Sequence, residues 1–319
     1  MPKFTIHHTT RYTYDSPVRD STNQLMLYPV KDMYQQVLRH DLDITGDPQV
    51  EIYEDYYGNE VGSFMHPGPH TELLIDSRVE VITEPRPLPE IDKSIEEQWA
   101  YLQQVKWQVP YIDFLKVEQF EGNEEVSAKV KELQTQQLKP LDAILELNKY
   151  VYDNFKYIQG VTNVETTLDE IWKLKAGVCQ DFAHMLSAML RMIGVPARYV
   201  SGYVCPDKTG MRGEGATHAW VEALIPFYGW LGFDPTNNCL ATNLHVRLAV
   251  GRNFRDCSPV RGTFKGVSNQ NLEVGVTVAH EDGYTNPEIV NILTPQPVKK
   301  IEKNSYQQFI EMQQQQQQQ

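Results

Sequence analysis

Residues 177–196 constrain the fold more than any other part of this chain. Apolar residues recur in this segment at the spacing of one helix face: Phe182, Leu186, Met189, Leu190 and Ile193. This spacing predicts a helix with one buried face, and Gly194 with Pro196 predicts its end. Cys179 then lies in or just before the first turn, where unpaired N–H groups and the helix dipole favour a thiolate. We therefore expect a nucleophile there, although a free cysteine taken alone is usually a small buried hydrophobe.

A predicted β-hairpin follows this helix. Residues 216–224 alternate so that His218 shares a face with Trp220 and Glu222, and in residues 230–234 Asp234 lies on the matching face. If the strands pair symmetrically about Pro226, His218 lies directly opposite Asp234. A slip of one residue would separate them. Taken singly, His218 could be a structural histidine and Asp234 could open a turn before the next proline.

Together these residues supply the three groups that activated-thiol acyl transfer needs. Cys179 provides the thiol, His218 an imidazole to deprotonate it, and Asp234 a carboxylate to orient the imidazole. The backbone N–H of Cys179, at a helix start, is the natural oxyanion donor. Gln180 and Tyr157 are the candidates for a second donor.

Four motifs resemble the transglutaminase-like superfamily, and more narrowly its bacterial branch of cysteine-protease-like proteins. They are Gly-Val-Cys-Gln-Asp-Phe-Ala-His (177–184), the segment 191–203, Thr-His-Ala-Trp-Val-Glu (217–222) and Gly-Trp-Leu-Gly-Phe-Asp-Pro-Thr-Asn (229–237). The resemblance implies that Cys179 is the nucleophile, His218 the general base and acid, and Asp234 the orienting carboxylate. It also implies a papain-like core. Segments 11–14, 23–29 and 55–59 resemble the accessory N-terminal region of the same branch.

The expected fold class is α+β, with helices packed on an antiparallel sheet and a β-rich domain before them. We predict a β-rich N-terminal accessory domain over residues 1–84, a Pro-rich linker over 85–92 and a catalytic core over 93–280. Segments 198–204 and 272–278 are expected to add strands to the sheet of the hairpin. Residues 281–319 form a C-terminal extension, whose seven final glutamines are expected to be disordered.

Composition excludes several classes of function. The net charge of −13 and the pI near 5.2 argue against a nucleic-acid partner. We expect no membrane partner, because no apolar run is long enough to span a bilayer, and a cytoplasmic location, because no signal-peptide core opens the chain. The cysteines are not closely paired in sequence, so we expect free thiols and neither a metal nor another cofactor. They are Cys179, Cys205, Cys239 and Cys257.

The sequence thus predicts a cysteine-dependent enzyme that acts on protein or peptide amides through a thioester. Hydrolysis, as by a cysteine protease or amidase, is the favoured outcome, because of the family branch and because water is always available. Protein-glutamine transamidation uses the same three residues and remains an alternative, as does a non-catalytic scaffold that retains the fold. The oligomeric state is left open.

Overall fold

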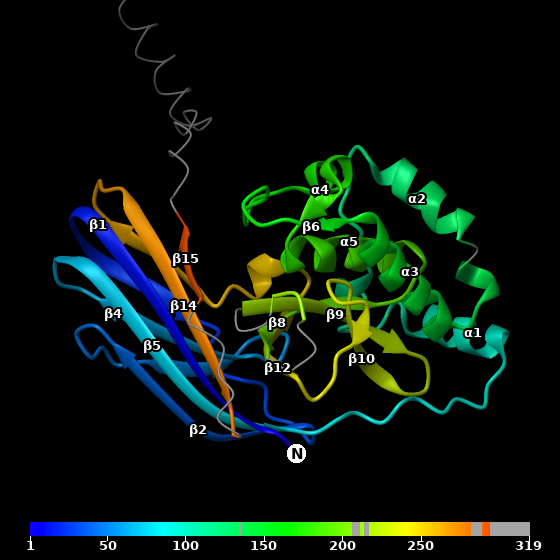
Figure 1. Cartoon of the computed structure of the whole chain (residues 1–319), viewed down its shortest axis with the longest axis horizontal. Coiled ribbons are helices and arrows are strands. Elements are labelled where there is room, and N and C mark those ends of the chain that lie inside the picture. The colour runs from blue at the N-terminus through cyan, green and yellow to red at the C-terminus, as the bar shows by residue number, and fades with distance from the viewer. Residues whose placement is uncertain (134, 206–210, 214–216, 282–288, 294–319) are drawn as a thin grey trace, which may run out of the picture.

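The computed structural model describes residues 1–133, 135–205, 211–213, 217–281 and 289–293. Two antiparallel sheets dominate it, and helices cover one of them (Figure 1). The class is therefore α+β, as the sequence predicts, with a core of helices on an antiparallel sheet. The predicted β-rich N-terminal region is a β half-barrel. The C-terminal glutamines lie outside the described residues.

The N-terminal sheet is built around one long strand, β1 (Lys3–Leu25). Its first half pairs with β5 (His70–Thr83) and β14 (Gln270–His280), and its second half with β4 (Glu60–His66) and β13 (Val260–Lys265). The pairing with β5 is irregular where β1 changes partners. The remaining strands of this sheet are β2 (Gln35–Ile44), β3 (Glu51–Glu54) and β15 (Ile289–Leu293).

The core sheet has the order β11-β10-β9-β8-β12. Its strands are β8 (Ala197–Val204), β9 (Thr217–Ile225), β10 (Gly229–Asp234), β11 (Cys239–Leu240) and β12 (His245–Gly251). The helix α5 (Cys179–Met192) packs against β8 and β9, with α3 (Pro140–Asn154) beside it (Figure 1). The apolar face of α5 and the alternate residues of β9, such as Val221, form one core.

The other helices begin where local sequence signals place them. α1 (Ile95–Val105) and α4 (Leu168–Leu174) each start with a complete capping box, and α2 (Asn123–Glu132) has acidic residues in its first turn. Three short 3₁₀ helices are η1 (Asp113–Leu115), η2 (Thr135–Gln137) and η3 (Phe254–Asp256). A short parallel pair, β6 (Lys156–Tyr157) with β7 (Ala176–Gly177), lies immediately before α5. In the part of the chain that the structure describes, no helix has the length and apolarity needed to span a bilayer.

One strand joins a different sheet from the one predicted. Residues 272–278 do form a strand, within β14, but β14 pairs with β1 and β15 in the N-terminal sheet and not with the hairpin. The alternating pattern predicts the strand but carries no information about its partner, which here lies about 260 positions away in sequence. The segment 198–204, within β8, pairs with β9 as predicted.

The N-terminal region completes the core sheet at its edge. β12 ends the strand order of that sheet, and two amide side chains from the N-terminal region bond its backbone. Asn59 donates to the carbonyl of Val250 and accepts from its N–H, both at 2.8 Å. Gln35 does the same for Arg247, again at 2.8 Å in each direction. These amides replace a neighbouring strand and protect the edge from pairing with another chain.

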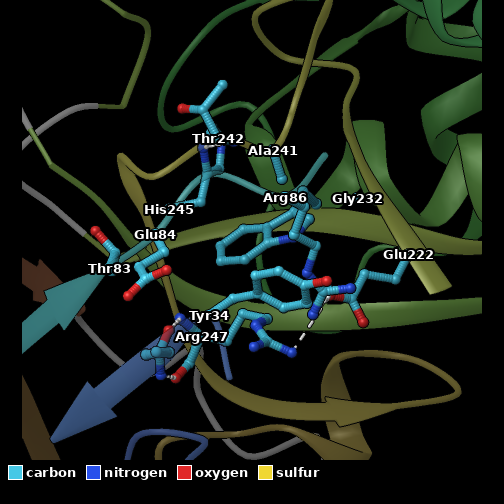
Figure 2. Close-up of a pocket in the computed structure, with 12 residues that line it drawn as sticks. Tyr34, Thr83, Glu84, Arg86, Glu222, Gly232, Ala241, Thr242, His245 and Arg247 are labelled. Atoms are coloured by element: carbon cyan, nitrogen blue, oxygen red, sulfur yellow. Dashed lines mark hydrogen bonds and ion pairs between the residues drawn. The ribbon is translucent and has the colours of Figure 1, made fainter. Parts of the chain in front are cut away.

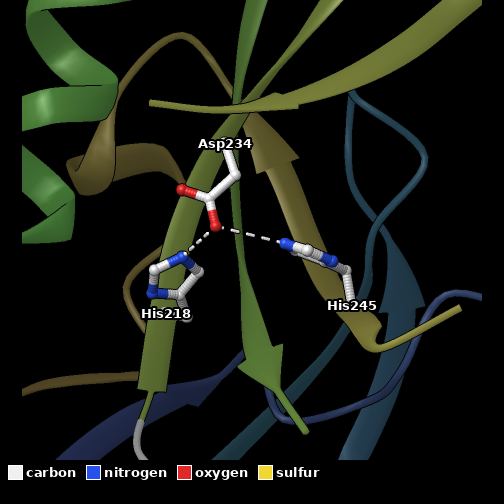
Figure 3. A group of neighbouring side chains, drawn as sticks. All are labelled: His218, Asp234 and His245. Atoms are coloured by element: carbon white, nitrogen blue, oxygen red, sulfur yellow. Dashed lines mark hydrogen bonds and ion pairs between the residues drawn. The ribbon is translucent and has the colours of Figure 1, made fainter. Parts of the chain in front are cut away.

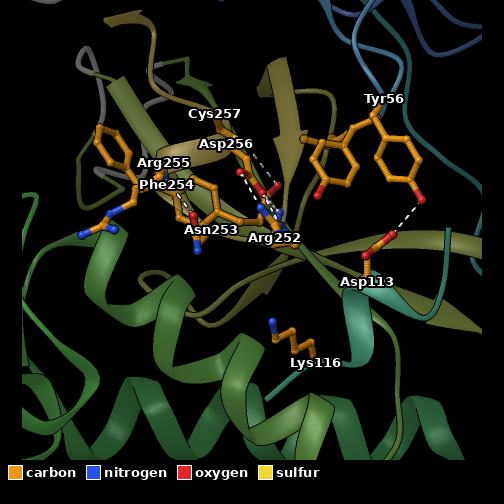
Figure 4. Close-up of polar contacts among 12 residues, drawn as sticks. Tyr56, Asp113, Lys116, Arg252, Asn253, Phe254, Arg255, Asp256 and Cys257 are labelled. Atoms are coloured by element: carbon orange, nitrogen blue, oxygen red, sulfur yellow. Dashed lines mark hydrogen bonds and ion pairs between the residues drawn. The ribbon is translucent and has the colours of Figure 1, made fainter. Parts of the chain in front are cut away.

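A second polar contact joins the N-terminal region to the core (Figure 4). The Tyr56 hydroxyl donates to Asp113 in η1 at 2.7 Å. Nearby, Arg252 donates from its side chain to both carboxylate oxygens of Asp256, at 2.8 and 3.1 Å. This ion pair fixes the conformation of the turn that follows β12.

Candidate active site

The first turn of α5 is fixed by its own sequence. Cys179 is the first helical residue and is half-buried. Asp181, two residues later, accepts from the Val178 N–H at 2.8 Å and from the Thr162 hydroxyl at 2.6 Å. Gly177 is required because the Asp181 carboxylate fills the space that a Cβ at this position would occupy. This packing places the thiol at a helix N-terminus, where backbone N–H groups have no intrahelical partner.

Tyr157 lies beside the thiol. It pairs with Gly177 in the β6–β7 ladder, and the next residue, Ile158, donates its N–H to the Gly177 carbonyl at 2.9 Å. Burial, and then the nearby Cys179, raise the pKa of the Tyr157 phenol to about 12, so it remains a hydrogen-bond donor at neutral pH. Gln180, the other candidate second donor, is half-buried at the second position of α5.

The hairpin brings His218 and Asp234 together, but in a register that differs from the one assumed. Gly229 pairs with Ile225 and Phe233 with Val221, so the pairing is centred on Phe227 and not on Pro226. The three-residue turn sets this centre, with Phe227 at a positive φ of 64°. The difference is two positions, so His218 and Asp234 keep the same face and become diagonal neighbours, which can still touch. His218 Nε2 lies 2.9 Å from Asp234 Oδ2.

His218 is held between Asp234 and Cys179. Its side chain is 0% exposed, and burial opposes a charge on the ring, but Asp234 and then Cys179 outweigh burial and raise the pKa of His218 to about 10. Since Nε2 is bonded to Asp234, Nδ1 is the nitrogen left for the thiol. Nδ1 is buried and makes no hydrogen bond of regular geometry, an arrangement that is common before substrate binds.

Asp234 is a fully buried carboxylate surrounded by donors. Burial would raise its pKa, yet His218 and the hydrogen bonds hold the pKa far below its usual range. Oδ1 accepts from the backbone N–H groups of Thr236 and Asn237, at 2.8 and 3.3 Å. Oδ2 accepts from Asn237 Nδ2 at 2.8 Å in addition to His218. The carboxylate is therefore kept ionised and fixed in orientation.

Two members of this cluster were not predicted from the sequence. His245 donates from Nε2 to Asp234 Oδ2 at 3.2 Å (Figure 3). Asn237 lies in a motif quoted above, but no role was assigned to it. Asn237 could have been suspected because Asp-Pro-Thr-Asn is a turn sequence, whereas His245 has no local signal: β12 brings it to the site by pairing with β8.

The ligand atoms of His218, Asp234 and His245 lie within 4.8 Å of one another, close enough to consider a metal. However, both Nε2 atoms already bond the same carboxylate oxygen, at 2.9 and 3.2 Å. These bonds need a proton on each Nε2, whereas a metal would need the lone pair. The geometry is that of a hydrogen-bonded cluster.

Other residues singled out from the sequence have structural roles. His184 accepts from the Phe254 N–H at 3.1 Å, and burial lowers its pKa to about 4. Cys205 and Cys257 are buried, and burial raises the pKa of both thiols well above the usual value. Gly213, at a φ of 77°, borders His218, since a Cβ there would lie 3.0 Å from Nδ1. Residues 214–216, which follow Gly213 in sequence, lie outside the described residues.

Comparisons with known proteins cover both parts of the chain. Residues 127–235 match the model of the transglutaminase-like superfamily, and residues 4–82 match that of the bacterial transglutaminase-like N-terminal region. An uncharacterised protein of Mycobacterium leprae is 31% identical over 284 residues, which cover 87% of this chain and 99% of that protein. The similarity therefore spans the N-terminal region as well as the core.

Two further matches carry functional names. A protein-glutamine gamma-glutamyltransferase of Pseudomonas aeruginosa is 28% identical over 123 residues, which cover 36% of this chain and 18% of that protein. The crystal structure of a candidate cysteine protease from Cytophaga hutchinsonii is similar with a TM-score of 0.67 at 22% identity, covering 92% of this chain and 98% of the other. At that identity the second match shows a shared fold.

Proposed function

Because the chain belongs to the transglutaminase-like superfamily, we propose that it catalyses acyl transfer from protein or peptide amides through a thioester on Cys179. The observation that carries the proposal is the placement of His218. Its ring is buried next to the thiol and is bonded through Nε2 to an ionised carboxylate. A scaffold protein has no need of a buried imidazole that is poised to gain and lose a proton.

The first half of the reaction forms the thioester. His218 takes the thiol proton, and the Cys179 sulfur attacks the amide carbonyl carbon. The backbone N–H of Cys179 and the Tyr157 hydroxyl are the proposed donors to the resulting oxyanion. The C–N bond then breaks as the His218 imidazolium protonates the leaving amine. Asp234 stabilises the imidazolium and fixes the ring so that Nδ1 faces the sulfur.

Hydrolysis is the proposed second half. Water gives up a proton to His218 and attacks the thioester, a carboxylic acid is released, and the thiolate is restored. An amine acceptor would use the same groups and form a new amide, and the Pseudomonas relative is named for that reaction. Transamidation is therefore the second candidate function.

A peptide or protein substrate is supported by a loop that is bonded to the helix of the nucleophile. The loop that follows β6 is tied to α5 by the bond between Thr162 and Asp181. Three apolar side chains of this loop are exposed: Ile158 (41%), Val161 (44%) and Val164 (50%). Exposed apolar side chains on a loop that is bonded to α5 offer contacts to the side chains of a bound peptide.

The pH dependence of Cys179 alkylation by iodoacetamide tests the proposal. Mass spectrometry of the digested protein reads all four cysteines at once, and half-buried Cys239 is the matched control thiol. We expect rapid labelling of Cys179 well below pH 8 in the wild type and its loss in His218→Ala. Labelling of Cys179 no faster than of Cys239 would refute an activated thiol and favour the scaffold alternative.

A second experiment separates the two acyl acceptors. Glutamine-containing peptides are incubated with the protein and methylamine, with Cys179→Ala as the control. Cleaved peptide, or conversion of glutamine to glutamate, identifies hydrolysis. An N-methyl amide as the main product identifies transamidation and would overturn the preference for water.

A further inference from the structure

His245 contacts the Asp234 carboxylate from a different direction than His218 does. Asp234 Oδ2 accepts from His218 at 2.9 Å and from His245 at 3.2 Å, and Figure 3 shows the two rings approaching this one oxygen from different strands. Three more donors come from Thr236 and Asn237. Among the described residues, His245 is the one donor to this carboxylate that is neither His218 itself nor part of the turn directly after Asp234.

The hydrogen bonds of His245 fix its protonation state. The backbone N–H of Thr242 donates to Nδ1 of His245 at 3.1 Å, so Nδ1 carries a lone pair and the single ring proton lies on Nε2. Protonation of Nδ1 would place its N–H opposite the N–H of Thr242, and this hydrogen bond would be lost. Burial and the nearby His218 lower the pKa of His245, and together they outweigh Asp234, which raises it. His245 is therefore a neutral donor to Asp234.

The buried ring of His245 also shields the Asp234 carboxylate from solvent. The His245 side chain is 1% exposed and packs edge-on against Trp220, with ring centres 5.1 Å apart. Beyond both rings lies a cavity of about 30 Å³, lined also by Thr242 and Arg247 (Figure 2). A space of this size holds one or two water molecules. His245 thus lies between Asp234 and a space from which water could otherwise reach the carboxylate.

We propose that His245 is a positioning residue for the acyl transfer: a neutral imidazole that holds Asp234 toward His218 and keeps the carboxylate dry. The inference deepens the proposed function and rests on it. Neutrality matters because a cation at this place would form its own ion pair with Asp234 and weaken the support that Asp234 gives to the His218 imidazolium. An apolar residue would leave one buried lone pair of Oδ2 without a donor.

Three substitutions at position 245 test the chemistry of the contact. His245→Ala removes the donor and should slow Cys179 alkylation at pH 6.5 about 10- to 100-fold. His245→Gln places a neutral amide N–H near the same point and should stay within about threefold of the wild type, since one hydrogen bond replaces another. His245→Asn, an amide too short to reach, is the matched control and should resemble the alanine variant.

A double-mutant cycle with Asp234→Ala separates positioning from general destabilisation. If His245 acts through Asp234, His245→Ala should change the alkylation rate less than about threefold once Asp234 is gone. An equal loss in both backgrounds would overturn the inference, as would a wild-type rate in His245→Ala. Labelling of buried Cys205 and Cys257 reports unfolding in the same sample, and if it rises in the alanine variants the contrast between glutamine and asparagine decides.

The same data distinguish failure of the inference from failure of the proposed function. A strong effect of Asp234→Ala with none from any change at position 245 overturns the inference and leaves the function standing. If Asp234→Ala leaves Cys179 reactivity unchanged, the proposed function and the inference both fall.

Discussion

Two buried carboxylates on the same hairpin have opposite kinds of partner. Asp234 at the end of β10 and Glu222 in β9 are 0% and 1% exposed. Asp234 is bonded by two imidazoles and by amide groups, whereas Glu222 is surrounded by three arginines. An arginine is always charged, but an imidazole can gain or lose a proton near neutral pH. The partners of a buried carboxylate, and not its burial, therefore decide whether it can support proton transfer.

Glu222 joins three parts of the chain. Arg198 in β8 donates to Oε2 at 2.8 and 2.6 Å, while Arg86 from the linker and Arg247 from β12 lie 3.8 and 3.7 Å from Oε1. Both Arg86 and Arg247 also contact Asp32 of the N-terminal region. Burial would raise the pKa of Glu222, but the arginines lower it to about 2. This network fixes the N-terminal region on the core.

Replacement of Asp234 should have the largest effect on reactivity. Asp234→Asn removes the negative charge that stabilises the His218 imidazolium and should slow Cys179 alkylation about 100- to 1,000-fold at neutral pH. The rate is measured by mass spectrometry with Cys239 as the internal control. Glu222→Gln should leave the same rate within about threefold, since Glu222 acts on stability. Equal losses in the two variants would show that the partners of the two carboxylates do not determine their roles.

Replacement of Glu222 should have the largest effect on stability. Glu222→Gln leaves three buried or half-buried arginines without their shared anion and should lower the free energy of unfolding by about 3–5 kcal/mol at pH 7. Urea denaturation followed by tryptophan fluorescence measures this loss. A stability within error of the wild type would show that Asp32 alone suffices for Arg86 and Arg247.

The pH dependence of the free energy of unfolding tests the cause of the stability loss expected for Glu222→Gln. The folded pKa of Glu222, about 2, lies below the ordinary value of 4.5, so its stabilisation is present above pH 4.5 and is lost as the pH falls toward 2. This titration corresponds to about 3 kcal/mol. The difference in stability between the wild type and Glu222→Gln should therefore narrow over this window. A constant difference would indicate a packing defect and not a lost charge.

The sequence predicted those features that depend on local spacing. The 3.6-residue pattern placed α5 with Cys179 in its first turn, and the alternation of the hairpin placed His218 and Asp234 on one face. The family, predicted from motifs, and the α+β class, predicted from the order of helices and strands, are both confirmed. The enzymatic roles of the three residues stay predictions.

The features that were missed depend on long-range packing. The hairpin register is set by the conformation of Phe227, which apolar patterning does not specify. The sheet that β14 joins is set by β1, at the other end of the chain. His245 reaches Asp234 only because β12 pairs with β8, and a single histidine in a strand carries no pattern that would reveal this.

The buried His184 differs from His218 in that it bonds a backbone N–H and not a carboxylate. His184 has a pKa of about 4, whereas Asp234 raises that of equally buried His218 to about 10. Because folded His184 stays neutral while the unfolded chain is protonated below pH 6.5, stability falls as the pH drops from 6.5 toward 4. At pH 5 this difference between the folded and unfolded pKa of His184 lowers the free energy of unfolding by about 2 kcal/mol.

His184→Gln should remove that cost and keep an acceptor for the Phe254 N–H. Urea denaturation at pH 7.5 and pH 5 measures the free energy of unfolding of both proteins. From pH 7.5 to pH 5, the variant should lose about 2 kcal/mol less stability than the wild type. His8, whose pKa burial also lowers to about 4, contributes equally to both proteins and cancels. Parallel losses in the two proteins would mean that His184 does not titrate on unfolding.

The smallest expected effect is the loss of stability in a variant of one arginine near Glu222. Arg86 donates to the Trp230 carbonyl at 2.7 Å but lies 3.8 Å from Glu222, so Arg86→Ala should cost about 1 kcal/mol. Arg198 makes the two short bonds to Glu222, and Arg198→Ala, the matched control, should cost more, about 3 kcal/mol. Urea denaturation of both variants gives the order. The reverse order would place the main support of Glu222 in the linker, at Arg86.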